Sequence, residues 1–125
     1  MILDTNALSA FADGDETLRD LLSGADRVAL PSIVLGEFRY GIAGSRHRAA
    51  YERWLMELLD DIEVLDVTEK TSTVYAGLRL VLKRSGRPIP ANDVWIAALG
   101  LQHRLPVVTR DRHFEVVPEL GRAGW

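Results

Sequence analysis

The chain opens with Met1-Ile2-Leu3-Asp4-Thr5-Asn6, a short apolar run that ends abruptly in a carboxylate, a hydroxyl and an amide. Three apolar residues before an acid predict a buried strand, with Asp4 where the strand leaves the sheet. Ligands of open α/β sheets bind outside the carboxyl ends of the strands, so Asp4 is well placed for chemistry. Taken alone, the commoner explanation is that Asp4 caps the next helix, since Asp, Thr and Asn are good N-cap residues. Only three residues precede Asp4, so the strand is expected to be unusually short.

The rest of the chain alternates between short strands and helices. Helices are expected over residues 7–13, 15–23, from Pro31-Ser32 to Gly41 or Gly44, 45–61, 68–85 and 93–103. Strands are expected over residues 27–30, 63–67, 106–109 and, at an edge, 114–117. Such alternation is typical of a parallel sheet with helices on both faces. We therefore expect an α/β fold in the form of a three-layer α/β/α sandwich.

Length and composition indicate a single domain over residues 1–125. Hydrophobic residues make up 47% and charged residues 26%, which is ordinary for a globular protein with one core. The absence of cysteine excludes disulfides and zinc–thiolate sites and fits a reducing compartment. No apolar run approaches the ~20 residues that span a bilayer, and no leader is recognisable, so a cytoplasmic location is expected. The net charge of -3 argues against a protein that coats nucleic acid indiscriminately but not against a nuclease.

Two acids follow apolar strands directly. Because parallel strands end at the same edge of a sheet, the side chains of Asp4 and Asp111 should emerge close together. Thr109 lies two residues before Asp111, on the same strand face, and is placed to support that site. Considered alone, Asp111 is about equally well explained as a residue that starts the turn into Phe114.

Glu37 is the acid with the least obvious structural reason. It lies four residues after Ile33 and three after Val34, on or beside the helix stripe that should face the core. Burying an ionised carboxylate without a partner costs several kcal/mol or neutralises the group. The usual remedy is a cation, which is either a metal ion or an internal Arg.

Asp93 stands at the start of a helix, where the helix dipole favours an acid and explains it in isolation. If Asn92 caps that helix, however, Asp93 is free to point elsewhere. Several carboxylates without a His/Cys set at ligand spacing suit Mg²⁺ or Mn²⁺ rather than Zn²⁺. Such sites meet substrate phosphates, which indicates phosphoryl transfer. His113, beside the expected edge strand, is predicted to fill space or bind backbone rather than a metal.

Together these motifs strongly resemble the PIN domain, and most closely the VapC-type toxin ribonucleases of bacterial toxin–antitoxin pairs. The resemblance runs in order along essentially the whole chain and rests on four short stretches: Asp4-Thr5-Asn6, Glu37 in the helix beginning at Pro31, Asp93 with Ile96-Ala97-Ala98, and Thr109-Arg110-Asp111. It implies a parallel sheet in the order 3-2-1-4-5. It also implies a set of Mg²⁺-binding catalytic acids, Asp4, Glu37, Asp93 and Asp111, with supporting roles for Thr5, Asn6 and Thr109.

The resemblance further implies endonucleolytic cleavage of structured RNA, commonly tRNA or rRNA, by metal-activated water, with Mn²⁺ as a possible substitute for Mg²⁺. Asp93 or Asp111 is expected to accept the proton. The implied partners are a second copy of the chain and a VapB-like antitoxin whose basic segment silences the acidic cleft. RNA contact is expected first of Arg112, because of its neighbour Asp111, and then of Arg110 and Arg39; most other basic residues are expected to be solvated surface charges.

Two other classes of protein are compatible with parts of this pattern. A receiver-type phosphoacceptor domain needs an acid ending the third strand and a Lys ending the last. Here the third strand is expected to end at Val67-Thr68, and no Lys follows Lys83. A catalytically silent PIN-fold protein-interaction module would keep the fold, although retention of all four acids gives no hint of decay.

Overall fold

The computed structural model describes residues 1–125 and contains one five-stranded sheet. The strands are β1 (Ile2–Leu3), β2 (Ala29–Pro31), β3 (Glu63–Leu65), β4 (Val107–Val108) and β5 (Arg122–Ala123). All neighbouring strands are parallel, and their order is β3-β2-β1-β4-β5. The expected order 3-2-1-4-5 is therefore confirmed. It differs from the 2-1-3-4-5 order of receiver-type domains, which excludes that alternative.

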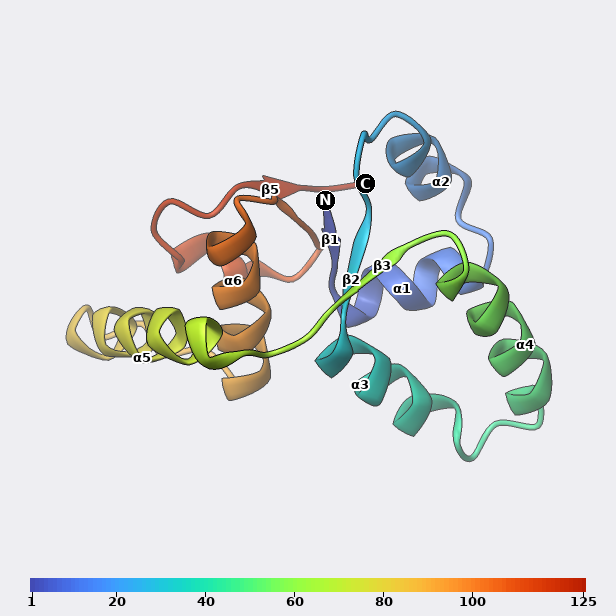
Figure 1. Cartoon of the computed structure of the whole chain (residues 1–125), viewed down its shortest axis with the longest axis horizontal. Coiled ribbons are helices and arrows are strands. Elements are labelled where there is room, and N and C mark those ends of the chain that lie inside the picture. Colours follow the sequence, from blue (N-terminus) through green and yellow to red (C-terminus); the bar gives the residue numbers. More distant parts are fainter.

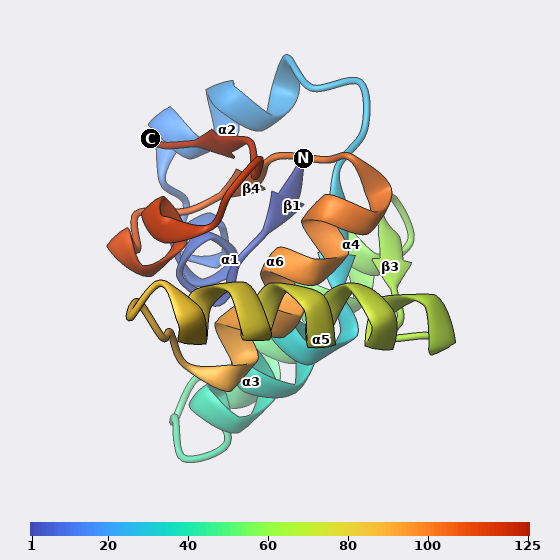
Figure 2. The same ribbon diagram turned by 90° about the vertical axis from the view of Figure 1, so that its left-hand side faces the viewer.

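Helices cover both faces of the sheet. They are α1 (Thr5–Ala12), α2 (Glu16–Ser23), α3 (Ser32–Ile42), α4 (Arg48–Leu59), α5 (Glu69–Arg84), α6 (Ala91–His103) and the 3-10 helix η1 (Arg112–Val116). Figure 1 shows α5 and α6 on one side of the strands and α1, α2 and α4 on the other. In Figure 2, α5 and α6 lie in front of the strands. The three-layer α/β/α sandwich is thus confirmed. None of the helices is both long and apolar enough to cross a membrane.

The carboxyl ends of the central strands meet the beginnings of three helices. β1 leads into α1 through Asp4, and β2 leads directly into α3. The first turn of α6 lies at the same end of the molecule, at the bottom of Figure 1. A parallel sheet produces this convergence because all of its strands end at one edge.

The central strands are fully buried. Both residues of β1 and of β4, and all three of β2, are inside the molecule. Such continuous apolar runs are typical of parallel strands that are covered on both faces. On the helical side, α6 is the most buried element, with Val94 and Ile96 to Gly100 inside.

Gly100 marks the closest approach between α6 and the sheet. A Cβ atom at this position would lie 2.8 Å from Leu120 Cδ1, 3.1 Å from the Leu105 carbonyl oxygen and 3.2 Å from Val107 Cγ2. Only glycine fits without displacing these neighbours. The carboxyl-terminal half of α6 is thereby held against β4, and Asp93 lies about two turns earlier on the same helix.

The segment after β4 differs from the prediction. Residues 114–117, expected as an edge strand, belong instead to η1 and its C-cap, and the fifth strand is Arg122–Ala123. The Asp111 carboxylate accepts a hydrogen bond from the His113 N–H at 2.9 Å, and the chain turns there. Phe114 is then buried, with 1% of its surface exposed. This local hydrogen bond overrides the strand propensity of the apolar residues.

The other element boundaries shift by at most three residues. α1 begins at Thr5 rather than at residue 7 because Asp4 is its N-cap. α6 begins at Ala91 with Pro90 in the N-cap position, so the prediction that Asn92 caps this helix is wrong. Asn92 and Asp93 both lie inside the first turn. Asp93 is therefore the third residue of α6, two helical positions later than expected.

Candidate active site

All four predicted acids line one cavity at the carboxyl end of the sheet. Its volume is about 150 Å³, and its lining consists of Asp4, Thr5, Asn6, Glu37, Asp93, Ile96 and Asp111. These residues come from the end of β1, from α1, α3 and α6, and from the residue before η1. The fold therefore gathers into one place acids that are far apart in the sequence. Thr109 lies at the end of β4, next to this cavity.

Two of the acids are held by backbone N–H groups. Asp4 Oδ1 accepts a hydrogen bond from Ala7 N at 2.8 Å, and Asp111 Oδ1 accepts one from His113 N at 2.9 Å. Asp4 therefore does cap α1, and Asp111 does start the turn that follows it, as the alternative explanations for these acids supposed. Capping and a place in the cavity are compatible because a carboxylate has two oxygen atoms. Each carboxylate is thus fixed in orientation through its Oδ1 atom.

Asp4 is the most buried of the acids, with 3% of its surface exposed. Burial raises the pKa of its carboxyl group, and the negative charges of Asp111 and Asp93 raise it further. Hydrogen bonds from the Thr109 hydroxyl and the Ala7 N–H oppose this rise without cancelling it. The Thr109 hydroxyl oxygen also accepts a hydrogen bond from Asp111 N at 2.8 Å. Thr109 therefore contacts both strand-end acids.

Glu37 reaches the cavity from α3 without a cationic partner. Its Oε1 atom is buried and has no hydrogen-bond partner, and Glu37 takes part in no salt bridge. Arg39, two residues further on, pairs with Glu52 at 3.1 Å instead. The alternative of an internal ion pair with Arg is therefore wrong. The Thr5 hydroxyl is likewise buried without a partner. Buried oxygen atoms of this kind are costly unless a ligand satisfies them.

His113 also belongs to the site, which the sequence analysis missed. Its Nδ1 atom lies 3.0 Å from Asp93 Oδ2 and 3.2 Å from Asp111 Oδ1. Burial raises the pKa of the Asp93 carboxyl group, the hydrogen bond from His113 lowers it, and the charge of Asp111 raises it again, leaving a net rise. The prediction for His113 assumed an extended chain after Asp111. The signal that would have found it is its spacing, two residues after an Asp that starts a turn.

The side chains present fit a divalent metal ion. No Lys or Arg lines the cavity to neutralise its four carboxylates, and oxygen ligands of this type suit Mg²⁺ or Mn²⁺. Ligand atoms of Asp93, Asp111 and His113 lie within 4.8 Å of one another. The raised pKa values of Asp4 and Asp93 reflect burial and mutual repulsion, both of which a cation would relieve. An imidazole nitrogen beside these oxygens favours transition metals over Mg²⁺.

The three arginines expected to contact RNA are engaged within the protein. Arg110 donates from Nε to the Trp125 carbonyl at 3.0 Å, and its guanidinium lies 4.3 Å from the centroid of the Trp125 ring. Arg39 pairs with Glu52, and Arg112 lies 3.7 Å from Glu115. Their side chains are nevertheless 44%, 55% and 88% exposed for Arg39, Arg110 and Arg112, respectively. RNA contact by these residues stays a prediction.

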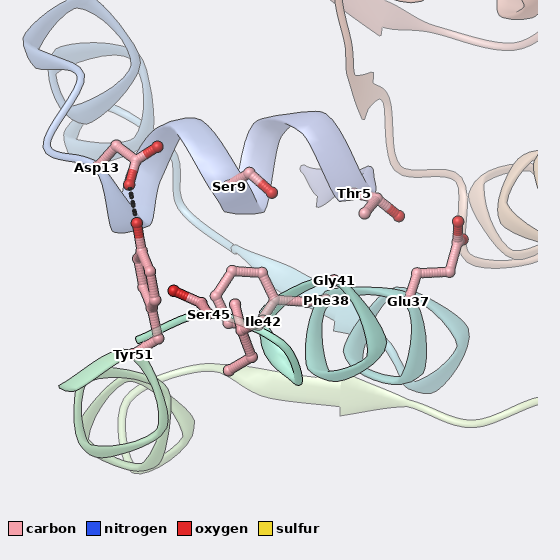
Figure 3. Close-up of a pocket in the computed structure, with 9 residues that line it drawn as sticks. All are labelled: Thr5, Ser9, Asp13, Glu37, Phe38, Gly41, Ile42, Ser45 and Tyr51. Atoms are coloured by element: carbon pink, nitrogen blue, oxygen red, sulfur yellow. Dashed lines mark hydrogen bonds between the residues drawn. The ribbon is translucent and has the colours of Figure 1, made fainter. Parts of the chain in front are cut away.

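A second cavity, of about 320 Å³, adjoins the acids between α1, α3 and α4 (Figure 3). It shares Thr5 and Glu37 with the acidic cavity, and Figure 3 shows both side chains at the same end of it. At the other end, the Tyr51 hydroxyl hydrogen-bonds Asp13 at 2.7 Å. Phe38 packs edge-on against Tyr51 in between. The acidic cavity thus continues into a partly apolar one.

Comparison with known proteins gives one consistent picture. The family model described as PIN domain matches residues 1–120. The chain is 35% identical over 115 residues to Ribonuclease VapC5 of Mycobacterium tuberculosis, an alignment that covers 90% of this chain and 84% of the relative. It is 30% identical over 129 residues to Ribonuclease VapC2 of Rickettsia felis, covering 99% and 96%. Among solved structures, it is similar to VapBC2 from Rickettsia felis bound to a DNA fragment from their promoter, with a TM-score of 0.89, 27% identity and coverage of 99% and 97%.

Proposed function

The chain belongs to the PIN-domain family and is similar to VapC ribonucleases over most of its length, and from that premise we propose that it is a metal-dependent endoribonuclease acting as the toxin of a toxin–antitoxin pair. One observation carries the proposal. Acids from four distant segments line one cavity, where Glu37 Oε1 is buried without a partner. A protein-interaction module would gain nothing from this costly arrangement, whereas a metal-dependent nuclease requires it.

We assign metal binding to Asp4, Glu37, Asp93 and Asp111, with Mg²⁺ as the ion and Mn²⁺ as a substitute. When bound, the metal supplies an acidified water and compensates charge on the phosphate. The backbone N–H groups that hold Asp4 and Asp111 keep these carboxylates in place, so little reorganisation is needed on binding. In this proposal, Thr109 positions both strand-end acids.

Two further residues, Thr5 and Asn6, border the cavity from the first turn of α1. The Thr5 hydroxyl is buried without a partner, and Asn6 is exposed. We propose that these side chains contact the RNA or water near the cut. The substrate in this proposal is a structured RNA such as tRNA or rRNA.

The same proposal includes a VapB-like antitoxin and a second copy of the chain. Several similar solved structures are complexes, including the DNA-bound VapBC of Salmonella typhimurium, with a TM-score of 0.88 and 28% identity. The acidic cavity holds no cationic side chain of its own, which suits a basic antitoxin segment as its inhibitor. We place the protein in the cytoplasm, where RNA targets are found.

Incubation with total RNA tests the proposal most directly. We expect discrete cuts with Mg²⁺ and none with EDTA. The cut ends are then mapped. Asp4→Asn should abolish cleavage, whereas Asp20→Asn, which changes an exposed acid on α2, should leave it intact. Circular dichroism should show both variants folded. Cleavage in EDTA, or by Asp4→Asn at the wild-type rate, would contradict the proposal, and no cleavage under any condition would favour the silent interaction module.

A further inference from the structure

The segment from Lys70 to Asn92, which contains most of α5 and the linker to α6, carries charge of one sign only. It holds five cations, Lys70, Arg79, Lys83, Arg84 and Arg87, and no Asp or Glu. The remainder of the chain holds ten of the fifteen Lys and Arg residues and all eighteen Asp and Glu residues. A strongly basic segment in a protein with a net charge of -3 indicates an anionic partner for that segment.

The cations at the end of α5 have no acidic partner within the protein. Lys83, Arg84 and Arg87 are exposed and form no salt bridge. Arg79 donates to the Tyr75 hydroxyl and stays exposed. The helix dipole accounts for Lys83 and Arg84, which lie in the last turn, but not for Arg79 or Arg87. These side chains therefore differ from the arginines that are already engaged beside the acids.

Two of these cations, Arg79 and Lys83, border a cavity of about 320 Å³ between α5, the linker and α6. Its lining consists of Arg79, Leu82, Lys83, Pro88, Ile89 and Val94. Leu82 and Val94 are each 1% exposed and form an apolar floor, while the two cations stand at the rim. The volume is at the small end of the range for ligand sites. An apolar floor with a cationic rim suits the flat face of a nucleobase with its phosphate beside it.

This basic cavity and the acidic one are lined by consecutive residues of α6. Val94, on its floor, directly follows Asp93, which lines the acidic cavity. Figure 2 shows the end of α5, the beginning of α6 and η1 on the same side of the molecule. From Arg87 to Asp93 the chain spans at most about 20 Å, a length that about six stacked nucleotides cover. One RNA strand can therefore reach both places.

We propose that the end of α5 and the following linker form an RNA-binding site separate from the acids, in which Lys83, Arg84 and Arg87 contact backbone phosphates and the cavity receives a base of the strand being cut. The inference rests on the proposed function, since it supposes that the acids act on RNA. A basic groove with an apolar surface for bases is the usual design for single-stranded RNA. Arg79 adds a guanidinium plane on which a base can stack.

A binding experiment in EDTA tests this site without cleavage. The probe is a fluorescein-labelled RNA stem–loop, and its affinity is followed by fluorescence anisotropy over a range of salt concentrations. The combined variant Lys83→Gln, Arg84→Gln and Arg87→Gln should bind at least about 10-fold more weakly at about 100 mM salt. Its slope of log affinity against log salt should be smaller by about two, because each lost phosphate contact on a single strand contributes about 0.7.

The matched control removes the same charge elsewhere. Arg46→Gln, Arg48→Gln and Arg53→Gln alter three exposed cations at and near α4, on the other side of the sheet from α5 (Figure 1). This control should keep the wild-type slope and affinity within about two-fold. Equal weakening by both variants, or equally tight binding of duplex DNA by the wild type, would overturn the inference. If the first variant unfolds, Arg87→Gln alone, in the linker, serves instead and should lower the slope by about 0.7.

Turnover with Mg²⁺ separates this inference from the proposed function. Phosphate contacts away from the cut bind substrate and transition state alike, so the variant should show a raised KM and an unchanged kcat. Unchanged KM with intact cleavage would overturn the RNA site and leave the nuclease. A wild-type protein that binds RNA through this site but never cuts it would overturn the proposed function and leave the site.

Discussion

Two junctions of the molecule are built from the same local parts and end in different environments. At the end of β1, Asp4 accepts a hydrogen bond from an N–H three residues later, and after β4, Asp111 accepts one from an N–H two residues later. Asp4 is 3% exposed, whereas the side chain of Asp111 is 28% exposed and lies beside His113. The same capping contact therefore supports a buried acid with a raised pKa at one junction and an accessible acid at the other. Burial rather than local motif decides how much each carboxylate gains from a cation.

Replacing each acid by its amide should give the largest difference in activity between the junctions at Asp4 and Asp111. Asn keeps an acceptor oxygen for the capping hydrogen bond but removes the charge. We expect Asp4→Asn to reduce Mg²⁺-dependent RNA cleavage by more than about 100-fold. Asp111→Asn should cost about 10- to 100-fold, because Asp111 is the more exposed of the two acids and gains less from a cation. Initial rates on one RNA substrate measure both, and equal losses would show that burial does not rank the acids.

In the absence of metal, the raised pKa of the buried Asp4 should make the stability of the protein depend on pH. The pKa of Asp4 lies above its ordinary value of 3.8, so the folded protein holds this proton more tightly than the unfolded chain. That contribution is fully present below the ordinary value and is lost as the pH rises through the raised one, at about 1.4 kcal/mol per pKa unit. Urea unfolding in EDTA should therefore show stability falling over this interval.

Two comparisons sharpen the pH experiment. Saturating Mg²⁺ should oppose the fall, because it binds the ionised folded state. Asp4→Asn should lack most of the fall and exceed the wild type in stability at neutral pH in EDTA, whereas Asp20→Asn should follow the wild type. A wild-type profile that rises with pH over the same interval would contradict the role given to burial.

Removing the histidine should make the two junctions more alike. In His113→Ala, Asp93 and Asp111 lose the imidazole that lies between them. We expect affinity for Mn²⁺ to fall by about 10-fold and affinity for Mg²⁺ to fall less, because imidazole is a better ligand for transition metals. Isothermal titration with each ion measures the ratio. His47→Ala, at an exposed position before α4, is the control, and the same ratio in both variants would exclude His113 as a ligand.

The smallest effect should come from the residue that contacts both junctions. Thr109→Val removes the acceptor of the Asp111 N–H and a hydrogen bond to Asp4. Leaving this partly buried donor unpaired should lower the free energy of unfolding by about 1–3 kcal/mol. Thr73→Val, on the exposed face of α5, should stay within about 0.5 kcal/mol. Urea unfolding compares the two, and equal stability would remove Thr109 from its positioning role.

Sequence reasoning identified residues that line the acidic cavity where a residue type conflicted with its surroundings. Asp4 was identified because it is an acid that ends an apolar run, and Glu37 because it is an acid on a helix stripe that faces the core. In both positions, burying the charged carboxylate is costly unless a ligand binds it. The strand order itself came from resemblance to a family rather than from spacing. Reasoning failed after Asp111, because one side-chain hydrogen bond turned an apolar segment into η1 and brought His113 to the acids.

The engagement of the arginines was also invisible in the sequence. Arg39 meets Glu52 on the next helix, and Arg110 meets Trp125 fifteen residues later. Both contacts depend on how distant elements approach one another, which propensity and periodicity do not encode. Proximity along the chain to an acid was therefore a poor guide to which cations are free.

The close packing at Gly100 couples the position of α6 to the sheet. A methyl group at this position would displace Leu120, Leu105 or Val107 or shift the helix itself. Asp93 lies on the same helix, about 10 Å away along its axis. The position of Asp93 in the acidic cavity therefore depends on a helix–sheet contact that lies outside that cavity. We expect a larger residue at position 100 to shift Asp93 relative to the other three acids while all four acids are retained.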